Sequence, residues 1–179
     1  MQDQNVVTPT VRECTIDDAA GVAALGARLF REAYGPTHPE PELSRYLARE
    51  YTTEVFADAS IQDGGFLLVI EDSDGTKLGY TWVRPSPNPP NGVTGHRSAE
   101  IVRFYVATER QGQGLGALLM NRCFDVARER GYDCVWLQVW QEAPWAIGFY
   151  KKMGLEVVGS AFFYFGDRVG DDHVMERRL

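Results

Sequence analysis

A glycine-rich stretch is the place in this chain where residue types and spacing most clearly favour chemistry. It reads QGQGLG, residues 111–116, and it lies between an apolar run and a segment with helical periodicity. Glycines let backbone amides turn toward one point, and a helix that begins there adds the positive end of its dipole. A phosphate group is the natural ligand of such an arrangement. The stretch therefore predicts a phosphate-binding loop.

Two known phosphate-binding patterns and one interpretation without a ligand have to be weighed for these glycines. The Walker pattern GxxxxGK[ST] does not occur in the chain. Gly112, Gly114 and Ala117 satisfy the dinucleotide pattern GxGxx[GA], but Asp133, the acidic residue at about the required distance, precedes its strand instead of ending it. Too few residues follow for a doubly wound nucleotide domain. A glycine loop that only permits close packing remains open as an interpretation.

The pattern [Q/R]xxGx[G/A] is also met, by Gln111, Gly114 and Gly116. It follows AEIVRFYV and precedes AIGFYKKMGL, so that strand, glycine loop, helix, strand and a second helix come in a fixed order. This set resembles the GNAT superfamily of acetyl-CoA-dependent N-acetyltransferases. The resemblance is most specific over residues 99–165 and extends over the whole chain at lower specificity.

Periodicity and turn residues predict the elements that position these motifs. The prolines and glycines of PSPNPPNGVTGH predict a long connection, interpreted either as a segment that overhangs a site or as a hairpin loop. The expected elements are a strand TVREC, a helix around 18–30, one or two short helices in LSRYLAREYTTEVFADAS, a hairpin of FLLVIE and KLGYTWVR, a strand AEIVRFYVA, a helix from Leu115 to Gly131, a strand CVWLQVW, a short helix PWAIGFYKKM, and closing strands GLEVVGSAFFYF and HVMERRL.

The resemblance implies a fold of the α/β (α+β) class. We expect a mixed, mostly antiparallel twisted sheet of about seven strands, with a V-shaped splay after the fourth strand and about four flanking helices. Residues 1–179 are expected to form a single GNAT acetyltransferase domain.

The resemblance also implies acetyl-CoA as cosubstrate and assigns residues to it. The backbone of Phe104, Tyr105 and Val106 would bind the pantetheine arm. Ala143 stands where many members carry an Asn that contacts the cofactor or an ordered water. Either Glu142 or Gln141 substitutes for it, or the contacts to CoA are fewer. Lys152 is either a contact to a CoA phosphate or a solvated helical lysine. The pyrophosphate would lie on Gln111, Gly112, Gln113, Gly114, Leu115 and Gly116.

Two residues are catalytic candidates by the same resemblance. Tyr150 matches the tyrosine that protonates the departing CoA thiolate, and its ordinary pKa of about 10 keeps it protonated until then. Glu100 stands in the register of the general-base glutamate of one branch. A base is needed because an amine must lose a proton before it attacks. The alternatives for Glu100 are a strand-edge carboxylate paired with an arginine such as Arg103, and a mechanism that relies on water alone.

The distribution of charge bears on the acceptor. Residues 1–75 hold 14 Asp and Glu against five Arg, whereas residues 76–179 hold 11 acids against 13 bases. This balance argues against nucleic acid as a partner and favours a small cationic amine, although an acidic surface that only aids solubility is the alternative. The stretches LFREAYGPTHPEPELSRYL, EIVRFYV, WLQVWQEAPWAIGFYKKMGLEVVGSAFFYFGD and DDHVMERRL most resemble, within the superfamily, the spermidine/spermine N-acetyltransferase branch of the PaiA type. Glu32, Tyr34 and Trp82 are the acceptor-side candidates.

Other acceptors and another class of protein remain open. One alternative is acetylation of a protein amino terminus or of an aminoglycoside-type amine. A sensor that binds acyl-CoA without turnover is the other: the presence of Tyr150 argues against it, and Ala143 in place of Asn argues for it.

Cysteine spacing and hydropathy limit location and metal content. Cys14, Cys123 and Cys134 are an odd number without CxxC spacing, so we expect neither a disulfide framework nor a metal site. Without a signal-peptide pattern or an apolar run of roughly 18 residues, we expect a cytoplasmic protein with no membrane partner. By family habit, a homodimer is expected.

Overall fold

The fold, seen in a computed structural model that describes residues 9–166 and 168–179, is a seven-stranded sheet with helices on both faces. The strand order is β1-β2-β3-β4-β5-β7-β6. The elements are β1 (Thr10–Glu13), η1 (Ile16–Asp18), α1 (Ala19–Tyr34), α2 (Glu42–Glu50), α3 (Thr53–Ile61), β2 (Phe66–Glu71), β3 (Lys77–Pro85), β4 (Ser98–Val106), η2 (Thr108–Arg110), α4 (Leu115–Glu129), β5 (Cys134–Trp140), α5 (Pro144–Lys152), β6 (Glu156–Phe165) and β7 (Arg168–Arg178).

Strand β2 explains why helices cover both faces of the sheet. Its residues from Phe66 to Ile70 are all buried, and successive side chains of a strand point to opposite faces. Phe66, Leu68 and Ile70 pack in one core with α4, while Leu67 and Val69 pack in the other with α1. An apolar run with no polar face must be covered on both sides. The mixed, mostly antiparallel sheet that the sequence predicts is confirmed.

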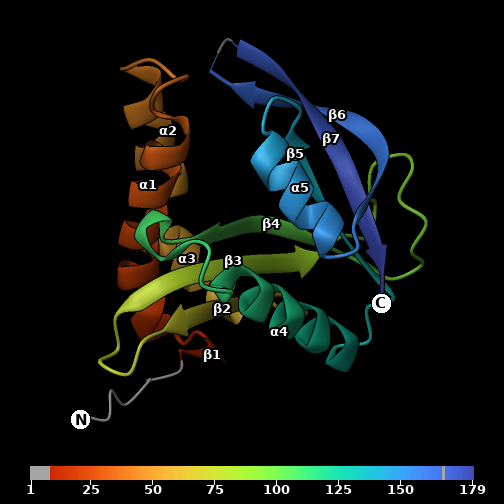
Figure 1. Ribbon diagram of the computed structural model, residues 1–179, viewed down its shortest axis with the longest axis horizontal. Helices are drawn as coiled ribbons and strands as arrows, with labels where there is room; N and C mark the ends of the chain where they lie inside the picture. Colours follow the sequence, from red (N-terminus) through yellow and green to blue (C-terminus); the bar gives the residue numbers. More distant parts are fainter. Residues whose placement is uncertain (1–8, 167) are drawn as a thin grey trace.

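The sheet opens between β4 and β5, the only parallel pair among the described strands. Only Ser98, Ala99 and Glu100 pair with β5, opposite Cys134, Val135 and Trp136, and the two strands then part. The β3–β4 register shifts by one residue in the same region: Trp82 lies opposite Arg103, the next residue Val83 lies opposite Ile101, and β4 thus has one extra residue. Such a bulge bends a strand. Figure 1 shows the hairpin of β6 and β7 diverging from β2–β4, which is the V-shaped splay expected from the sequence.

Three details differ from or refine the predictions. The last strand is longer than HVMERRL, because β7 begins at Arg168 and pairs with β6 along almost its whole length. The segment LSRYLAREYTTEVFADAS forms two helices, α2 and α3. The long connection after β3 is fastened to β7 by the Glu176 carboxylate, which accepts hydrogen bonds from the Thr94 and Gly95 amides.

The cysteines, metal ligands and helix lengths can be compared with expectation in the described residues. Cys14, Cys123 and Cys134 are buried free thiols. Within residues 9–166 and 168–179, no group of three His, Cys, Asp or Glu side chains is arranged to hold a metal ion. No helix of this part of the chain has the length and apolar character needed to cross a membrane.

Asp18 ties the start of α1 to the first strands. Its carboxylate accepts hydrogen bonds from Arg12 Nη1 and Nη2 at 2.7 and 2.9 Å and from the Thr15 amide at 2.9 Å. Lys77 Nζ lies 3.2 Å away, and Arg12 also bonds to Glu71. These hydrogen bonds, from Arg12 above all, hold the pKa of Asp18 well below its usual range. The network fixes α1, the helix whose far end lines the site described below.

We expect Asp18→Asn to lower the free energy of unfolding at pH 7 by about 2 kcal/mol, because charge-assisted hydrogen bonds to a nearly buried group are lost. The pKa of Asp18 is lower in the folded than in the unfolded protein. Its stabilisation is therefore present above the ordinary Asp pKa of about 4 and is lost as the pH falls through the folded pKa. Urea unfolding at several pH values measures this, with Asp17→Asn, an exposed neighbour, as control. Equal effects of the two variants at pH 7 would contradict the role of the network.

Candidate active site

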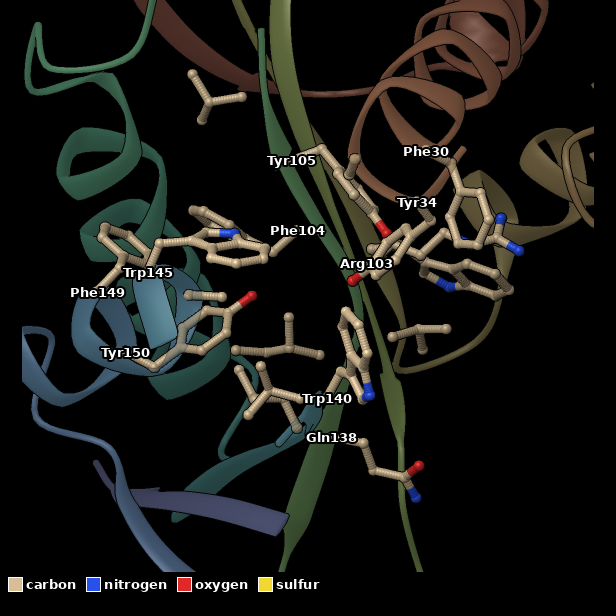
Figure 2. Close-up of a pocket in the computed structure, with 18 of the residues that line it drawn as sticks. Phe30, Tyr34, Arg103, Phe104, Tyr105, Gln138, Trp140, Trp145, Phe149 and Tyr150 are labelled. Carbon is tan, nitrogen blue, oxygen red and sulfur yellow. The ribbon is translucent and has the colours of Figure 1, made fainter. Parts of the chain in front are cut away.

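A cavity of about 960 Å³ lies where β4 and β5 part. Its lining comes from α1, α2, β3, β4, the glycine loop, the start of α4, β5, α5, β6 and β7. Figure 2 shows Tyr150, Phe149 and Trp145 on one side of it and Tyr34, Tyr105 and Arg103 on the other. Segments from both ends of the chain therefore meet in one site.

The glycine loop lies at the amino end of α4, as predicted. Gly112 and Gly114 have φ of 76° and 81°, and Gly114 directly precedes the first residue of the helix. A Cβ added at either would meet no atom within 4 Å, so here glycine is required by backbone conformation and not by space. The first amides of a helix have no partner within the helix and carry its positive dipole end. Gln111, Gly112, Gly114, Leu115 and Gly116 line the cavity, whereas Gln113 does not.

Gly116 has a different reason to be glycine. A Cβ there would lie 3.2 Å from Phe149 Cε2, so the absence of a side chain lets α4 and α5 approach each other at the cavity. At Gly116, glycine is therefore explained by close packing. At Gly112 and Gly114 it is explained by backbone conformation.

Strand β4 presents a free edge to the cavity. Phe104, Tyr105 and Val106 all line the cavity and pair with β3, but they have no pairing with β5, because the β4–β5 pairs end at Glu100. Backbone N–H and C=O groups on that side are open to a ligand that bears amides. The loop, the helix end and this edge together fit an elongated molecule with phosphates at one end and amides along its arm, as acetyl-CoA has.

Tyr150 lies in α5 with its ring against β4. Its ring centroid is 6.3 Å from that of Phe104 and 5.5 Å from that of Phe149, and its hydroxyl points into the cavity (Figure 2). Burial, and secondly the nearby Tyr34, raise the pKa of Tyr150 above its usual value. The hydroxyl therefore keeps its proton through the neutral range and is a donor, not a base.

Glu100 lies where β4 leaves β5, and it is ion-paired. Its Oε2 accepts a hydrogen bond from Arg84 Nε at 2.7 Å. The partner named from the sequence, Arg103, is wrong: its Nη2 lies 3.5 Å from Glu50 Oε2, and its guanidinium stacks 4.2 Å from the centroid of Tyr51. The reason is cross-strand pairing: Arg84 of β3 lies directly opposite Glu100, whereas Arg103 lies opposite Trp82.

Of the three acceptor-side candidates, two line the cavity. Tyr34 and Trp82 do so, at its α1 side. Glu32 lies outside it on the exposed face of α1, where it accepts hydrogen bonds from Arg28 and from Thr108 Oγ1, each at 2.9 Å. Residues two apart on a helix are about 200° apart around it, so these neighbours cannot share a face.

Ala143 and Lys152 also lie away from the cavity lining. Ala143 is only 2% exposed and precedes α5, where its carbonyl accepts a hydrogen bond from the Ile147 amide. Lys152 is exposed and lines a second cavity with Thr94 and Glu176. Nothing in this geometry brings either side chain to the glycine loop.

Sequence reasoning missed most of the acceptor half of the cavity. Asp172 of β7 lines it at 6% exposure, and burial, followed by the charge of Asp171, raises the pKa of Asp172 to about 6. Two consecutive aspartates in a strand must point to opposite faces, so one of them had to turn inward. An aromatic wall surrounds this half, made of Tyr34, Tyr46, Tyr51, Trp82, Trp140, Phe163 and Phe165.

Comparison with known proteins agrees with this arrangement. Residues 27–155 match the acetyltransferase (GNAT) family. The chain is 34% identical to a mycothiol acetyltransferase from Saccharomonospora viridis over 142 residues, 79% of this chain but only 43% of that relative. It is 25% identical to an uncharacterised N-acetyltransferase from Lactobacillus delbrueckii subsp. lactis, with 87% of this chain and 89% of the relative covered. The chain thus spans less than half of the first of these relatives.

Among solved structures, the fold is similar to that of a PaiA N-acetyltransferase from Thermoplasma acidophilum in complex with coenzyme A. The TM-score is 0.76 at 19% identity, and 96% of this chain and 99% of that one are covered. The likeness at this identity is one of fold.

Proposed function

Because the chain belongs to the GNAT acetyltransferase family, we propose that it transfers the acetyl group of acetyl-CoA directly to a primary amine. The observation that carries the proposal is the convergence of the glycine loop, the free edge of β4 and Tyr150 on one cavity. Acetyl-CoA, when bound, supplies an activated acyl group. The chain's own residues bind it, orient it and move protons.

We assign the phosphate-binding role to the amides from Gln111 to Gly116 and the pantetheine role to the edge of β4. Tyr150 is the proton donor to the departing sulfur, because its hydroxyl lies in the cavity and stays protonated at neutral pH. Glu100 is a weaker candidate for the base than its register indicates, since Arg84 already holds its carboxylate. Ala143 and Lys152 receive no direct role in binding.

A small cationic amine such as a polyamine is the acceptor that we propose first, in line with the PaiA-type branch. The acidic front half of the chain and the fold of the PaiA acetyltransferase support it. The cavity itself offers few anionic groups, because two of its three carboxylates, Glu50 and Glu100, are paired with arginines. Protein amino termini, aminoglycoside-type amines and the acceptor of the mycothiol acetyltransferases remain alternatives, as does a non-catalytic acyl-CoA sensor.

Domain extent, assembly and location stay proposals. The continuous sheet from β1 to β7 supports a single domain over 1–179. Phe162, Tyr164 and Val169, all more than half exposed at the β6–β7 edge of the sheet, support a homodimer. A cytoplasmic location is a prediction from the sequence alone.

We expect acetyl-CoA to release free CoA thiol only when a suitable amine is present, because hydrolysis is slower than attack by an oriented amine. A panel of spermidine, spermine, aminoglycosides, amino-terminal peptides and the mycothiol precursor amine tests this, with thiol release and product mass as readouts. Acetyl-CoA binding without turnover on any amine would favour the sensor. Failure to bind acetyl-CoA would refute both.

A further inference from the structure

One carboxylate of the cavity has no cationic partner. Among the side chains that the structure describes, three carboxylates line the cavity: Glu50, Glu100 and Asp172. Arginines hold the first two, at 3.5 and 2.7 Å. The side-chain carboxylate of Asp172 forms no hydrogen bond or ion pair with the described residues, although the residue is only 6% exposed. A buried carboxylate without a partner is costly and requires an explanation.

Strand pairing places this carboxylate in the acceptor half. Asp172 lies directly opposite Trp140 of β5 on one side and Ala161 of β6 on the other. Directly opposite residues share a face of the sheet. That face turns toward α1, because the Trp140 ring lies 6.5 Å from the ring of Tyr34. Asp171 points to the other face and is exposed.

Tyr34 links Asp172 to the catalytic candidate. The charge of Asp172 acts on Tyr34, and Tyr34 acts in turn on Tyr150. Tyr34, Tyr150 and Asp172 all line the same cavity. A ligand in this cavity would therefore have both an anion and a proton donor among the groups around it.

The surroundings of Asp172 leave it ionised at neutral pH but a stronger base than an ordinary aspartate. Burial raises its pKa to about 6, and Asp171 of its own strand adds to the effect. The titratable side chains that line the same cavity include Tyr34 of α1 and His38 after it, while the directly opposite residues of β5 and β6, Trp140 and Ala161, do not titrate. A pKa near the working pH suits a proton acceptor.

We propose that Asp172 binds the ammonium group of the acceptor and takes one of its protons. This inference rests on the proposed function and adds the residue that recognises the amine. The ammonium gives one proton to Asp172, which passes it to solvent. The neutral nitrogen forms a bond to the acetyl carbonyl carbon, the carbon–sulfur bond breaks, Tyr150 gives its proton to the sulfur, and the nitrogen's second proton restores Tyr150.

The geometry also bears on the class of acceptor. A single unpaired carboxylate matches one ammonium group, and the aromatic wall around it suits an apolar body and cation–π contact. Further cationic groups of a longer acceptor would lie outside this half of the cavity. Asp172 also lies beyond residues 27–155, the segment that matches the family.

The test compares Asp172→Asn with Asp171→Asn, the neighbouring carboxylate on the opposite face. With spermidine and n-butylamine as probes, we expect Asp172→Asn to lower kcat/KM at least 100-fold, to flatten the acidic limb near pH 6, and to leave the Kd for acetyl-CoA within twofold of wild type. Asp171→Asn should change the Kd for acetyl-CoA and the kcat/KM above pH 7 less than twofold, and loss of its charge should move the acidic limb to lower pH without flattening it. Calorimetric titration of each amine into the CoA-saturated protein should show binding to wild type and none to Asp172→Asn.

Several outcomes would overturn the inference. One is an Asp172→Asn variant with kcat/KM within threefold of wild type; another is loss of the acidic limb in Glu100→Gln instead. The Asn side chain keeps the shape and removes a buried charge, so a melting temperature no lower than wild type separates a chemical role from loss of fold. If wild type acetylates neither probe nor any amine of the panel, the proposed function fails. In that case calorimetry alone tests whether Asp172 binds an ammonium group. The inference is refuted if wild type binds neither amine.

Discussion

Replacement of Tyr150 by Phe is expected to lower kcat by roughly two to three orders of magnitude, the usual contribution of a positioned proton donor. The substitution removes one hydroxyl and keeps the ring that packs on Phe104 and Phe149. The glycine loop and the edge of β4 are untouched. We therefore expect the Kd for acetyl-CoA to change less than twofold, while thiol release in the presence of the acceptor nearly stops.

The matched control for this variant is Tyr164→Phe, because Tyr164 is 66% exposed on β6 and does not line the cavity. It should keep wild-type kcat. Since the pKa of Tyr150 is raised above its usual value, the loss in Tyr150→Phe should be the same from pH 6 to pH 8. A variant that keeps a third or more of the wild-type kcat would show that sulfur leaves without help from this hydroxyl.

Replacement of Gly114 by Ala is expected to raise the Kd for acetyl-CoA at least tenfold. Its φ of 81° is in the left-handed region, where a Cβ costs roughly 1–2 kcal/mol. The chain can relieve this strain by turning the peptide before α4, and that turns the amides of the loop away from the point where a phosphate would lie. Isothermal titration with acetyl-CoA measures the change.

Gly75 provides the control, because its φ is 82° and an added Cβ there also meets nothing within 4 Å. It lies in the turn between β2 and β3, away from the cavity lining. Gly75→Ala should therefore lose a similar amount of stability in urea unfolding and bind acetyl-CoA as wild type does. Equal Kd values for the two variants would mean that the loop has no part in binding.

The elements of the fold were predictable wherever one local rule decided them. The apolar run FLLVIE before the turn DSDGT, the helical period after Leu115 and proline in the first turn of α5 all predicted elements that the structure confirms. The start of β7 was not predictable in this way. Residues 168–172 include glycine and two aspartates, which favour turns, and it is pairing with β6 that holds them extended.

The same distinction between local and long-range effects applies to the site residues. The glycine loop and Tyr150 belong to contiguous motifs, so their neighbours in the sequence identify them. The acceptor half combines α1 with β7, more than a hundred residues later in the chain. Strand β7 enters the sheet between β5 and β6, and no local pattern indicates that Asp172 then faces Tyr34. The role of Glu100 was left open by its register, because its pairing with Arg84 depends on the cross-strand neighbour in β3.

The parting of β4 and β5 gives this sheet two edges in its interior. A strand edge with unpaired backbone groups is a template for pairing with another chain, and proteins usually blunt or cover such edges. In the function that we propose, the amide-bearing arm of acetyl-CoA covers the edge of β4 in place of a missing strand. A ligand that binds only the native state stabilises that state more as its concentration rises. We therefore expect acetyl-CoA to raise the free energy of unfolding of this chain. At low acetyl-CoA concentration, we expect the chain to lack its substrate and also to be less stable.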